Sequence, residues 1–138
     1  MKRYAVDTRI AAPPEVVWRV LVEDMPRDPA PFGIRRIEGS VARGGRLKLW
    51  SEVAPERAFR LRVATFEAPR KMVWQGGMPF GFFTGTRTFT IGAADGGSHF
   101  AMEEVFTGLL SGPITRSMPD LGPSFATFAD ALTRKAER

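Results

Sequence analysis

The alternation of apolar and polar positions predicts that most of this chain is β-strand. Residues 2–10 place Tyr4, Val6 and Ile10 on one face and charged side chains on the other, which is typical of a half-buried strand. Six further segments with this pattern follow at the spacing of hairpins and are separated by turn residues. These segments are residues 34–40, 46–53, 58–66, 71–75, 84–93 and 98–107.

A first helix is expected over residues 14–22, ahead of a proline-rich loop over residues 23–33. Pro14 suits the first turn of a helix, where a backbone N–H has no helical partner. The loop contains three prolines, which leaves room for one short helical turn, and Phe32 is its one large apolar residue. The buried face of the helix is expected to hold Val17, Trp18, Val20 and Leu21.

The C-terminal stretch carries an apolar stripe whose residues recur at alternating steps of four and three, which is helical spacing. Pro119 and Pro123 interrupt this stripe, because each removes an N–H from the helical ladder and clashes with the preceding turn, at a cost of ~3 kcal/mol or more. We therefore expect a short turn over residues 113–118, a break, and a firm helix over about 123–136. Phe125, Phe128 and Leu132 then grip the sheet, and Ile114, Met118 and Leu121 form a movable end.

The order of these elements predicts an α+β fold in a single domain over residues 1–138. Seven antiparallel strands with one apolar face are closed by the long C-terminal helix, and one or two short helices follow the first strand. The sheet must twist and curl to wrap that helix, and we expect a pocket between the two. Strand parity directs these side chains inward: Leu47, Leu49, Val53, Phe59, Leu61, Val63, Met72 and Trp74.

The last predicted hairpin brings opposite charges onto the apolar face. If Ala93 pairs with Ser98 across a four-residue turn, the same ladder places Arg87 opposite Glu104. Directly opposed side chains have Cβ atoms about 4.5–5.5 Å apart, so a hydrogen-bonded ion pair is within reach. Two interpretations remain open. The charges form a buried salt bridge that satisfies itself, or one of them contacts a polar group of a ligand.

Two connections between strands bear on the pocket. Residues 54–57 (APER) are expected to form a turn. Residues 76–83 (GGMPFGFF) are expected to form a longer loop with large apolar residues between glycines. This loop either covers the pocket mouth as a flap or plugs the open end of the core, and the plug is the preferred interpretation.

Composition and charge exclude several classes of function. The net charge is +5, and Arg46, Lys48, Arg60 and Arg62 fall on outer strand faces, which we interpret as solvated because no nucleic-acid-binding motif accompanies them. Cysteine is absent and the lone histidine, His99, is expected to point outward, so we expect no disulfide, metal site or histidine-based triad. No phosphate-binding glycine motif, signal peptide or membrane-spanning run is found, which agrees with a cytoplasmic protein without a cofactor.

Several segments resemble the SRPBCC superfamily. Residues 10–18 (IAAPPEVVW) are similar to its I-x-A-P-x-E-x-V-W start, and residues 104–108 (EVFTG) are similar to its E-x-F-x-G before the last helix. Further matches are residues 31–32, 34–39, 72–77 and 85–89. The resemblance covers essentially the whole chain and implies the START-like helix-grip fold, in the group that includes the polyketide cyclase/dehydrase and lipid-transport family. Arg87 stands where a histidine is common in that family.

The resemblance implies a cavity that takes a small hydrophobic or amphipathic molecule between the sheet and the C-terminal helix. The favoured hypothesis is a monomeric or dimeric binding protein whose ligand meets Arg87 and Glu104 with its polar end. One alternative is a cyclase or dehydratase in which Glu104 performs acid–base catalysis and Arg87 stabilises an enolate-like charge. Another is a protein-interaction module like the Hsp90-activator homologues, which would need an exposed apolar patch. The expected ligand contacts are Tyr4, Leu49, Leu61, Val63, Met72, Trp74, Arg87, Phe89, Met102, Glu104, Phe106, Met118, Leu121, Phe125 and Phe128.

Overall fold

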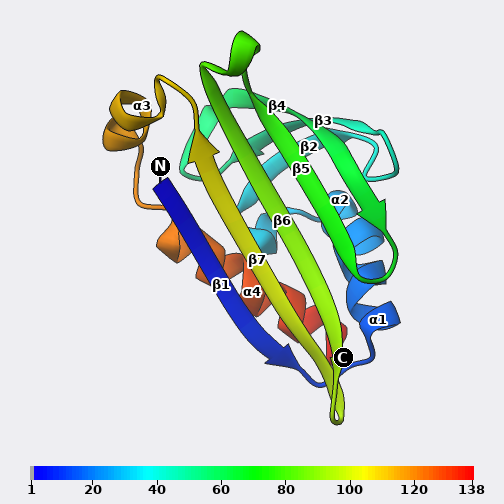
Figure 1. Ribbon diagram of the computed structural model, residues 1–138. Coiled ribbons are helices and arrows are strands. Elements are labelled where there is room, and N and C mark those ends of the chain that lie inside the picture. The colour runs from blue at the N-terminus through cyan, green and yellow to red at the C-terminus, as the bar shows by residue number, and fades with distance from the viewer. Residues whose placement is uncertain (1) are drawn as a thin grey trace.

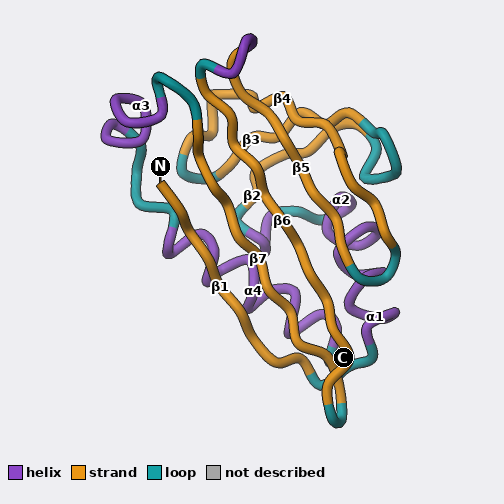
Figure 2. The backbone as a smooth tube through the Cα atoms, viewed as in Figure 1, coloured by secondary structure: helices purple, strands orange, loops and turns teal. Residues whose placement is uncertain are grey.

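A computed structural model describes residues 2–138, which form a curled sheet around one long helix (Figure 1). Helices α1 and α4 lie on the same side of this sheet (Figure 2). In chain order the elements are β1 (Lys2–Ile10), α1 (Pro14–Arg19), η1 (Val20–Asp24), α2 (Met25–Arg27), η2 (Ala30–Phe32), β2 (Ile34–Gly39), β3 (Arg46–Ser51), β4 (Ala54–Glu67), β5 (Lys71–Met78), η3 (Pro79–Gly81), β6 (Phe83–Ala94), β7 (Gly97–Thr107), α3 (Ser111–Ser117) and α4 (Gly122–Ala136).

All the strands join one seven-stranded sheet in the order β1-β7-β6-β5-β4-β3-β2. Each neighbouring pair is antiparallel, and β1 adds to the free edge of β7 along its whole length. The predicted α+β class and the seven-stranded curled sheet are therefore confirmed. Strands β1, β2, β6 and β7 match the predicted segments to within one residue, whereas β3 ends earlier, β4 begins earlier and β5 ends later than predicted.

Helix α1 begins at Pro14, as the sequence predicts, and the helical path continues beyond residue 22 as the π-helical segment η1. Val17, Trp18 and Leu21 on this path are buried. The following proline-rich stretch holds two short helical segments, α2 and η2, where one turn was expected. Phe32 is buried at the end of η2, so this stretch is packed onto the core.

The expected turn at residues 54–57 is wrong, because these residues extend β4 and the chain reverses at Glu52 and Val53. The register shifts between β3 and β4 just before this reversal. Val53 lies in the reversal itself rather than in a strand, and its side chain is 44% exposed. Phe59, also predicted to point inward, is 40% exposed, although its register partner Leu49 is buried. The reason is that α4 packs chiefly against β1 and the helical segments and does not cover this part of β4.

The expected loop at residues 76–83 is instead the end of a long hairpin. Strand β5 runs to Met78, β6 begins at Phe83, and η3 forms the reversal. Figure 1 shows this hairpin projecting beyond the rest of the sheet. Phe80 at its tip is 92% exposed, so the prediction that these residues plug the core is wrong.

The two prolines break the C-terminal stretch as predicted. Helix α3 ends at Ser117, Met118 has an extended backbone, and α4 begins at Gly122 with Pro123 in its first turn. Phe125 is buried on α4, as the grip requires. Neither α4 nor any other helix within the described residues is long and apolar enough to cross a bilayer.

The core between sheet and helices is centred on Phe128. Its ring lies 5.2 Å from that of Phe32, 5.9 Å from that of Phe89 and 6.5 Å from that of Phe100, measured between centroids. All four side chains are almost completely buried. Burying a side chain of this size contributes about 1.5–3 kcal/mol, so this cluster holds α4 against the sheet.

Candidate functional site

One row of polar and aromatic side chains crosses the inner face of the sheet from β1 to β5. The register places Tyr4 opposite Glu104, Glu104 opposite Arg87, and Arg87 opposite Trp74. Directly opposed residues of an antiparallel sheet point to the same face. The predicted pairing of Arg87 with Glu104 is therefore confirmed, and Tyr4 and Trp74 extend the row on either side.

Arg87 and Glu104 form a close ion pair between the sheet and α4. The Arg87 Nε donates to the Glu104 Oε1 at 2.9 Å, and Nη2 lies 2.7 Å from the same oxygen. The two side chains are only 20% and 12% exposed, so neither points into bulk solvent. The guanidinium carbon also lies 4.9 Å from the centre of the Phe125 ring on α4, a cation–π distance. The pair therefore links the sheet to the helix that closes it.

The second carboxylate oxygen of Glu104 has no hydrogen bond to another residue in the range 2–138, since both short contacts use Oε1. Oε2 lies over Gly85, where a Cβ atom would come within 3.0 Å of it. Gly76 is the register partner of Gly85, and a Cβ there would come within 2.7 Å of the Leu61 side chain. These two adjacent glycines therefore make room for the carboxylate and for Leu61 on the inner face.

Trp74 adds a buried polar atom without a partner. Its side chain is almost completely buried. Its indole Nε1 has no hydrogen-bond acceptor within the described part of the chain. The ring packs edge-on against Phe89 at 4.8 Å between centroids. Leaving a buried donor unpaired costs about 1–3 kcal/mol, so an acceptor placed here would be stabilised. Sequence parity predicted that Trp74 points inward, but it could not predict the unpaired N–H.

The structure divides the predicted ligand contacts into two groups. The buried ones are Leu49, Val63, Met72, Trp74, Phe89, Met102, Phe106, Phe125 and Phe128. The half-buried ones are Tyr4, Leu61, Arg87, Glu104, Met118 and Leu121. Tyr4 lies beside the ion pair, with its ring 6.0 Å from that of Phe125 and 6.4 Å from that of Phe106. Water therefore reaches the interior near the two charges and the α3–α4 break.

A hollow of about 730 Å³ lies along strands β2 to β6, apart from the ion pair. Its lining residues are Glu38, Gly39, Arg46, Leu47, Lys48, Arg60, Leu61, Arg62, Gln75, Gly76, Gly77, Met78 and Thr84. One predicted ligand contact, Leu61, is part of this lining. The four basic residues of this lining are exposed to solvent, as their outward parity predicts. Their alternation on two adjacent predicted strands was the signal that they gather in one place.

These observations define the class of the protein. A curled antiparallel sheet that grips a C-terminal helix, with a charged pair between the two, is a helix-grip protein. The sequence model of the polyketide cyclase / dehydrase and lipid transport family matches residues 1–137, so the chain belongs to this family of the SRPBCC superfamily, as the segments 10–18 and 104–108 predicted. No curated protein sequence matches the chain.

Solved structures confirm the fold. Protein MLL2253 from Mesorhizobium loti has a TM-score of 0.74 at 17% identity, covering 97% of this chain and 96% of its own. Protein CV1439 from Chromobacterium violaceum has a TM-score of 0.68 at 14% identity, covering 99% and 97%. Ara h 8.0201 has a TM-score of 0.66 at 13% identity, covering 98% and 97%. At these identities the likeness establishes the fold alone.

Proposed function

We propose that this protein binds a small hydrophobic or amphipathic molecule between the sheet and α4, with the polar end of that molecule at Arg87 and Glu104. The ion pair carries the proposal, because two partly accessible charges lie on an otherwise apolar inner face. Ligand sites are usually apolar with a few convergent polar groups. The description of the family, which includes lipid transport, supports an apolar ligand.

The hydrogen-bond donors and acceptors of this row of side chains indicate which polar groups the ligand would carry. The Trp74 indole and the Arg87 guanidinium offer N–H donors, whereas the Glu104 carboxylate accepts. A molecule with a carbonyl and a hydroxyl close together would satisfy both kinds of group. Its carbonyl would accept from Trp74 or Arg87, and its hydroxyl would donate to the free Oε2 of Glu104.

The apolar body of the ligand would lie toward Leu61, Phe106 and Leu121. The deeper region around Phe128 is closed by packed rings, so a ligand there would have to displace core side chains. Leu121 borders the break between the two C-terminal helices, where the chain lacks continuous helical hydrogen bonds. A small separation of α3 from α4 would therefore admit the ligand without opening the core.

The test uses the neutral fluorescent probe N-phenyl-1-naphthylamine and its displacement by an aromatic hydroxy-ketone, 2-hydroxy-1-(naphthalen-2-yl)ethanone. We expect the wild-type protein to bind both. Arg87→Met and Trp74→Phe should each weaken the hydroxy-ketone by about tenfold, the value of one hydrogen bond, and should leave the probe bound. Native mass spectrometry of the purified protein would identify any molecule retained from the cell.

The matched control is Arg3→Met, because Arg3 of β1 pairs with Glu103 of β7 on the outer face of the sheet. This variant should leave both affinities unchanged. The proposal fails if the probe does not bind to the wild-type protein, or if Arg3→Met weakens the hydroxy-ketone as much as Arg87→Met does.

The second candidate is a cyclase or dehydratase activity at the same place, favoured by the unbonded Oε2 of Glu104. This oxygen could take a proton from a substrate carbon, and Arg87 would stabilise the resulting enolate-like charge. Glu104→Gln keeps the shape and an acceptor oxygen but removes the base. Turnover of a polyketide-like substrate should then fall by about 100-fold or more while product binding largely survives. Unchanged turnover in Glu104→Gln would rule this activity out.

A further inference from the structure

Large exposed apolar side chains gather at the end of the molecule where the β5–β6 hairpin projects. We call this cluster the apolar tip; its members are Met78, Phe80, Phe82, Leu109 and Leu110. Phe80 is 92% exposed and Leu109 is 83% exposed, values that leave nearly the whole side chain in water. An exposed apolar cluster of this kind marks an interaction surface rather than a part of the core.

The apolar tip is a built structure that joins two segments distant in sequence. The Leu110 N–H donates to the Phe82 carbonyl oxygen at 2.8 Å. The Phe80 and Phe82 rings meet edge-on at 6.5 Å between centroids. Phe80 has φ 60°, a left-handed conformation that bulky residues rarely adopt, and this backbone directs its ring away from the protein. The hairpin therefore holds its largest apolar side chain in water at a conformational cost.

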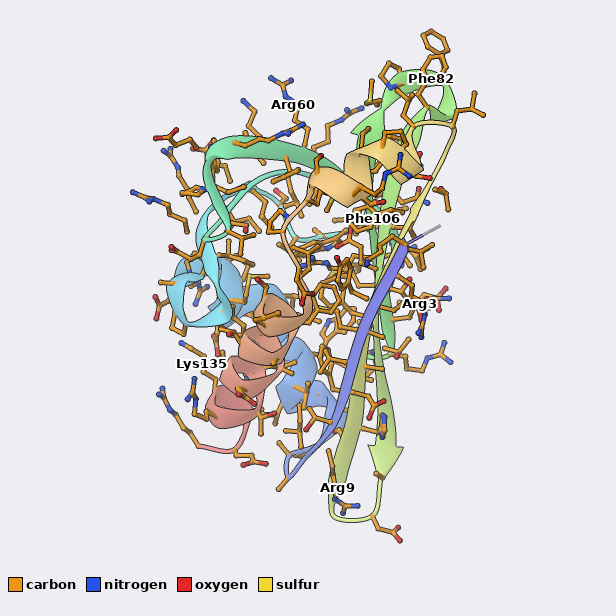
Figure 3. All side chains as sticks on the ribbon, turned by 90° about the vertical axis from the view of Figure 1, so that its left-hand side faces the viewer. Arg3, Arg9, Arg60, Phe82, Phe106 and Lys135 are labelled. Carbon is orange, nitrogen blue, oxygen red and sulfur yellow. The ribbon has the colours of Figure 1, made fainter. Side chains whose placement is uncertain are left out.

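Basic side chains lie beside the apolar tip. The hollow described above is lined by Met78 of the tip and by four basic residues of β3 and β4, Arg46, Lys48, Arg60 and Arg62. Arg60 points outward at the same end of the molecule as Phe82, above Phe106 (Figure 3). The apolar and the positive surfaces therefore face the same side.

The arrangement of these charges opposes folding. The register places Arg46 directly opposite Arg62 and Lys48 directly opposite Arg60, and like charges in direct opposition destabilise a sheet. The acidic residue in the lining, Glu38, lies directly opposite Lys48 and is also paired with Arg36, so it offsets only part of this positive charge. An anionic partner would relieve the repulsion, so the surface has the charge complementary to such a partner.

We propose that this end of the protein docks on the surface of a lipid bilayer that contains anionic headgroups. Phe80, Leu109 and their neighbours enter the boundary between headgroups and acyl chains, and the basic side chains of β3 and β4 contact the anionic headgroups. The basic side chains beside the exposed apolar ones favour a bilayer with anionic headgroups, because such a surface offers apolar matter and negative charge together. This proposal does not depend on ligand binding, and its test uses no ligand.

The test is co-sedimentation of the full chain with lipid vesicles at about 0.1 M salt, where the screening length is about 10 Å. One set of vesicles is phosphatidylcholine alone, and the other also contains about 30% phosphatidylglycerol. The wild-type protein should sediment with the anionic vesicles, and high salt should release it. The double variant Phe80→Ser/Leu109→Ser should bind at least about tenfold more weakly, since two apolar insertions are lost. Both side chains are exposed, so circular dichroism and thermal unfolding should show a normal fold.

Two matched variants separate the apolar and the electrostatic contributions. Arg60→Gln should weaken binding by about fivefold, whereas Arg9→Gln removes the same charge at the opposite end of the molecule and should have no effect (Figure 3). Phe80→Trp should retain binding and add a blue shift of tryptophan emission on contact with anionic vesicles.

Three results would overturn the proposal. The first is no sedimentation of the wild-type protein with anionic vesicles at low salt. The second is undiminished binding of Phe80→Ser/Leu109→Ser. The third is a lipid-free dimer of the wild-type protein that becomes a monomer in that double variant by sedimentation velocity, because the tip would then be an interface between copies of the chain.

Discussion

Replacing Arg87 by methionine tests the position of the ion pair through the stability of the fold. Removing one partner of a fully buried pair costs about 3–5 kcal/mol, because a charge is left in the interior without compensation. The Arg87 and Glu104 side chains are 20% and 12% exposed, so solvent stabilises the charge that is left and lowers this cost. We therefore expect Arg87→Met to lower the free energy of unfolding by about 2–3 kcal/mol.

The measurement is urea unfolding followed by circular dichroism, with the slope of the unfolding free energy compared between variants. In a thermal scan the same loss corresponds to a fall of roughly 8 °C in Tm. The double variant Arg87→Met/Glu104→Leu replaces both charges by apolar groups of similar size and should lie within about 1 kcal/mol of the wild-type protein. The double variant should therefore be more stable than Arg87→Met by about 2 kcal/mol.

The control for this prediction is Arg3→Met, on the outer face of the neighbouring strands. Arg3 lies 2.6 Å from Glu103, so its contact is as short as that of Arg87, but the two side chains are 57% and 42% exposed. An exposed pair of this kind contributes about 0–1 kcal/mol. If Arg87→Met destabilised the protein no more than Arg3→Met, the claim that the Arg87 pair is enclosed between sheet and helix would be refuted.

Three further predictions concern single positions. Gly108→Ala should destabilise the fold by more than about 2 kcal/mol in urea, because Gly108 has φ 111° and a Cβ there would lie 2.5 Å from the Phe82 carbonyl oxygen; an unaffected midpoint would contradict this. Ser98→Ala should cost about 1–2 kcal/mol in the same assay, because the buried Ser98 hydroxyl donates to the Ala12 carbonyl at 2.6 Å. Trp74→Phe should lower the free energy of unfolding by no more than about 2 kcal/mol, because removal of the unpaired buried N–H offsets part of the cost of the smaller ring, and a larger loss would count against that assignment.

Local rules were enough to predict most of the fold. Alternation placed the limits of β1, β2, β6 and β7 to within one residue. The turn after Ala93 set the register that brings Arg87 to Glu104. The absence of an N–H at Pro119 and Pro123 predicted the break between the two C-terminal helices. In each case a short stretch of sequence determines the backbone geometry, and distant parts of the chain do not change it.

The errors lie where distant parts of the chain decide the outcome. Val53 alternates correctly with its neighbours in sequence, but it is exposed because the chain reverses at Glu52 and Val53. Phe80 reads as a core residue because it is large and apolar, yet the hairpin extends far enough to carry it into water. The missing acceptor of the Trp74 N–H depends on every atom packed around the indole, which no local pattern encodes.

The backbone hydrogen bond from Leu110 to Phe82 has a mechanical consequence for the molecule. Helix α3 begins at the residue after Leu110, so this hydrogen bond couples the hairpin tip to the start of α3. Only residues 118–121 connect α3 to α4, and they lack continuous helical hydrogen bonds. A displacement imposed on the tip would therefore appear first as a change in the angle between α3 and α4, while the core around Phe128 stays fixed. Amide hydrogen exchange at Leu110 reports directly on that motion.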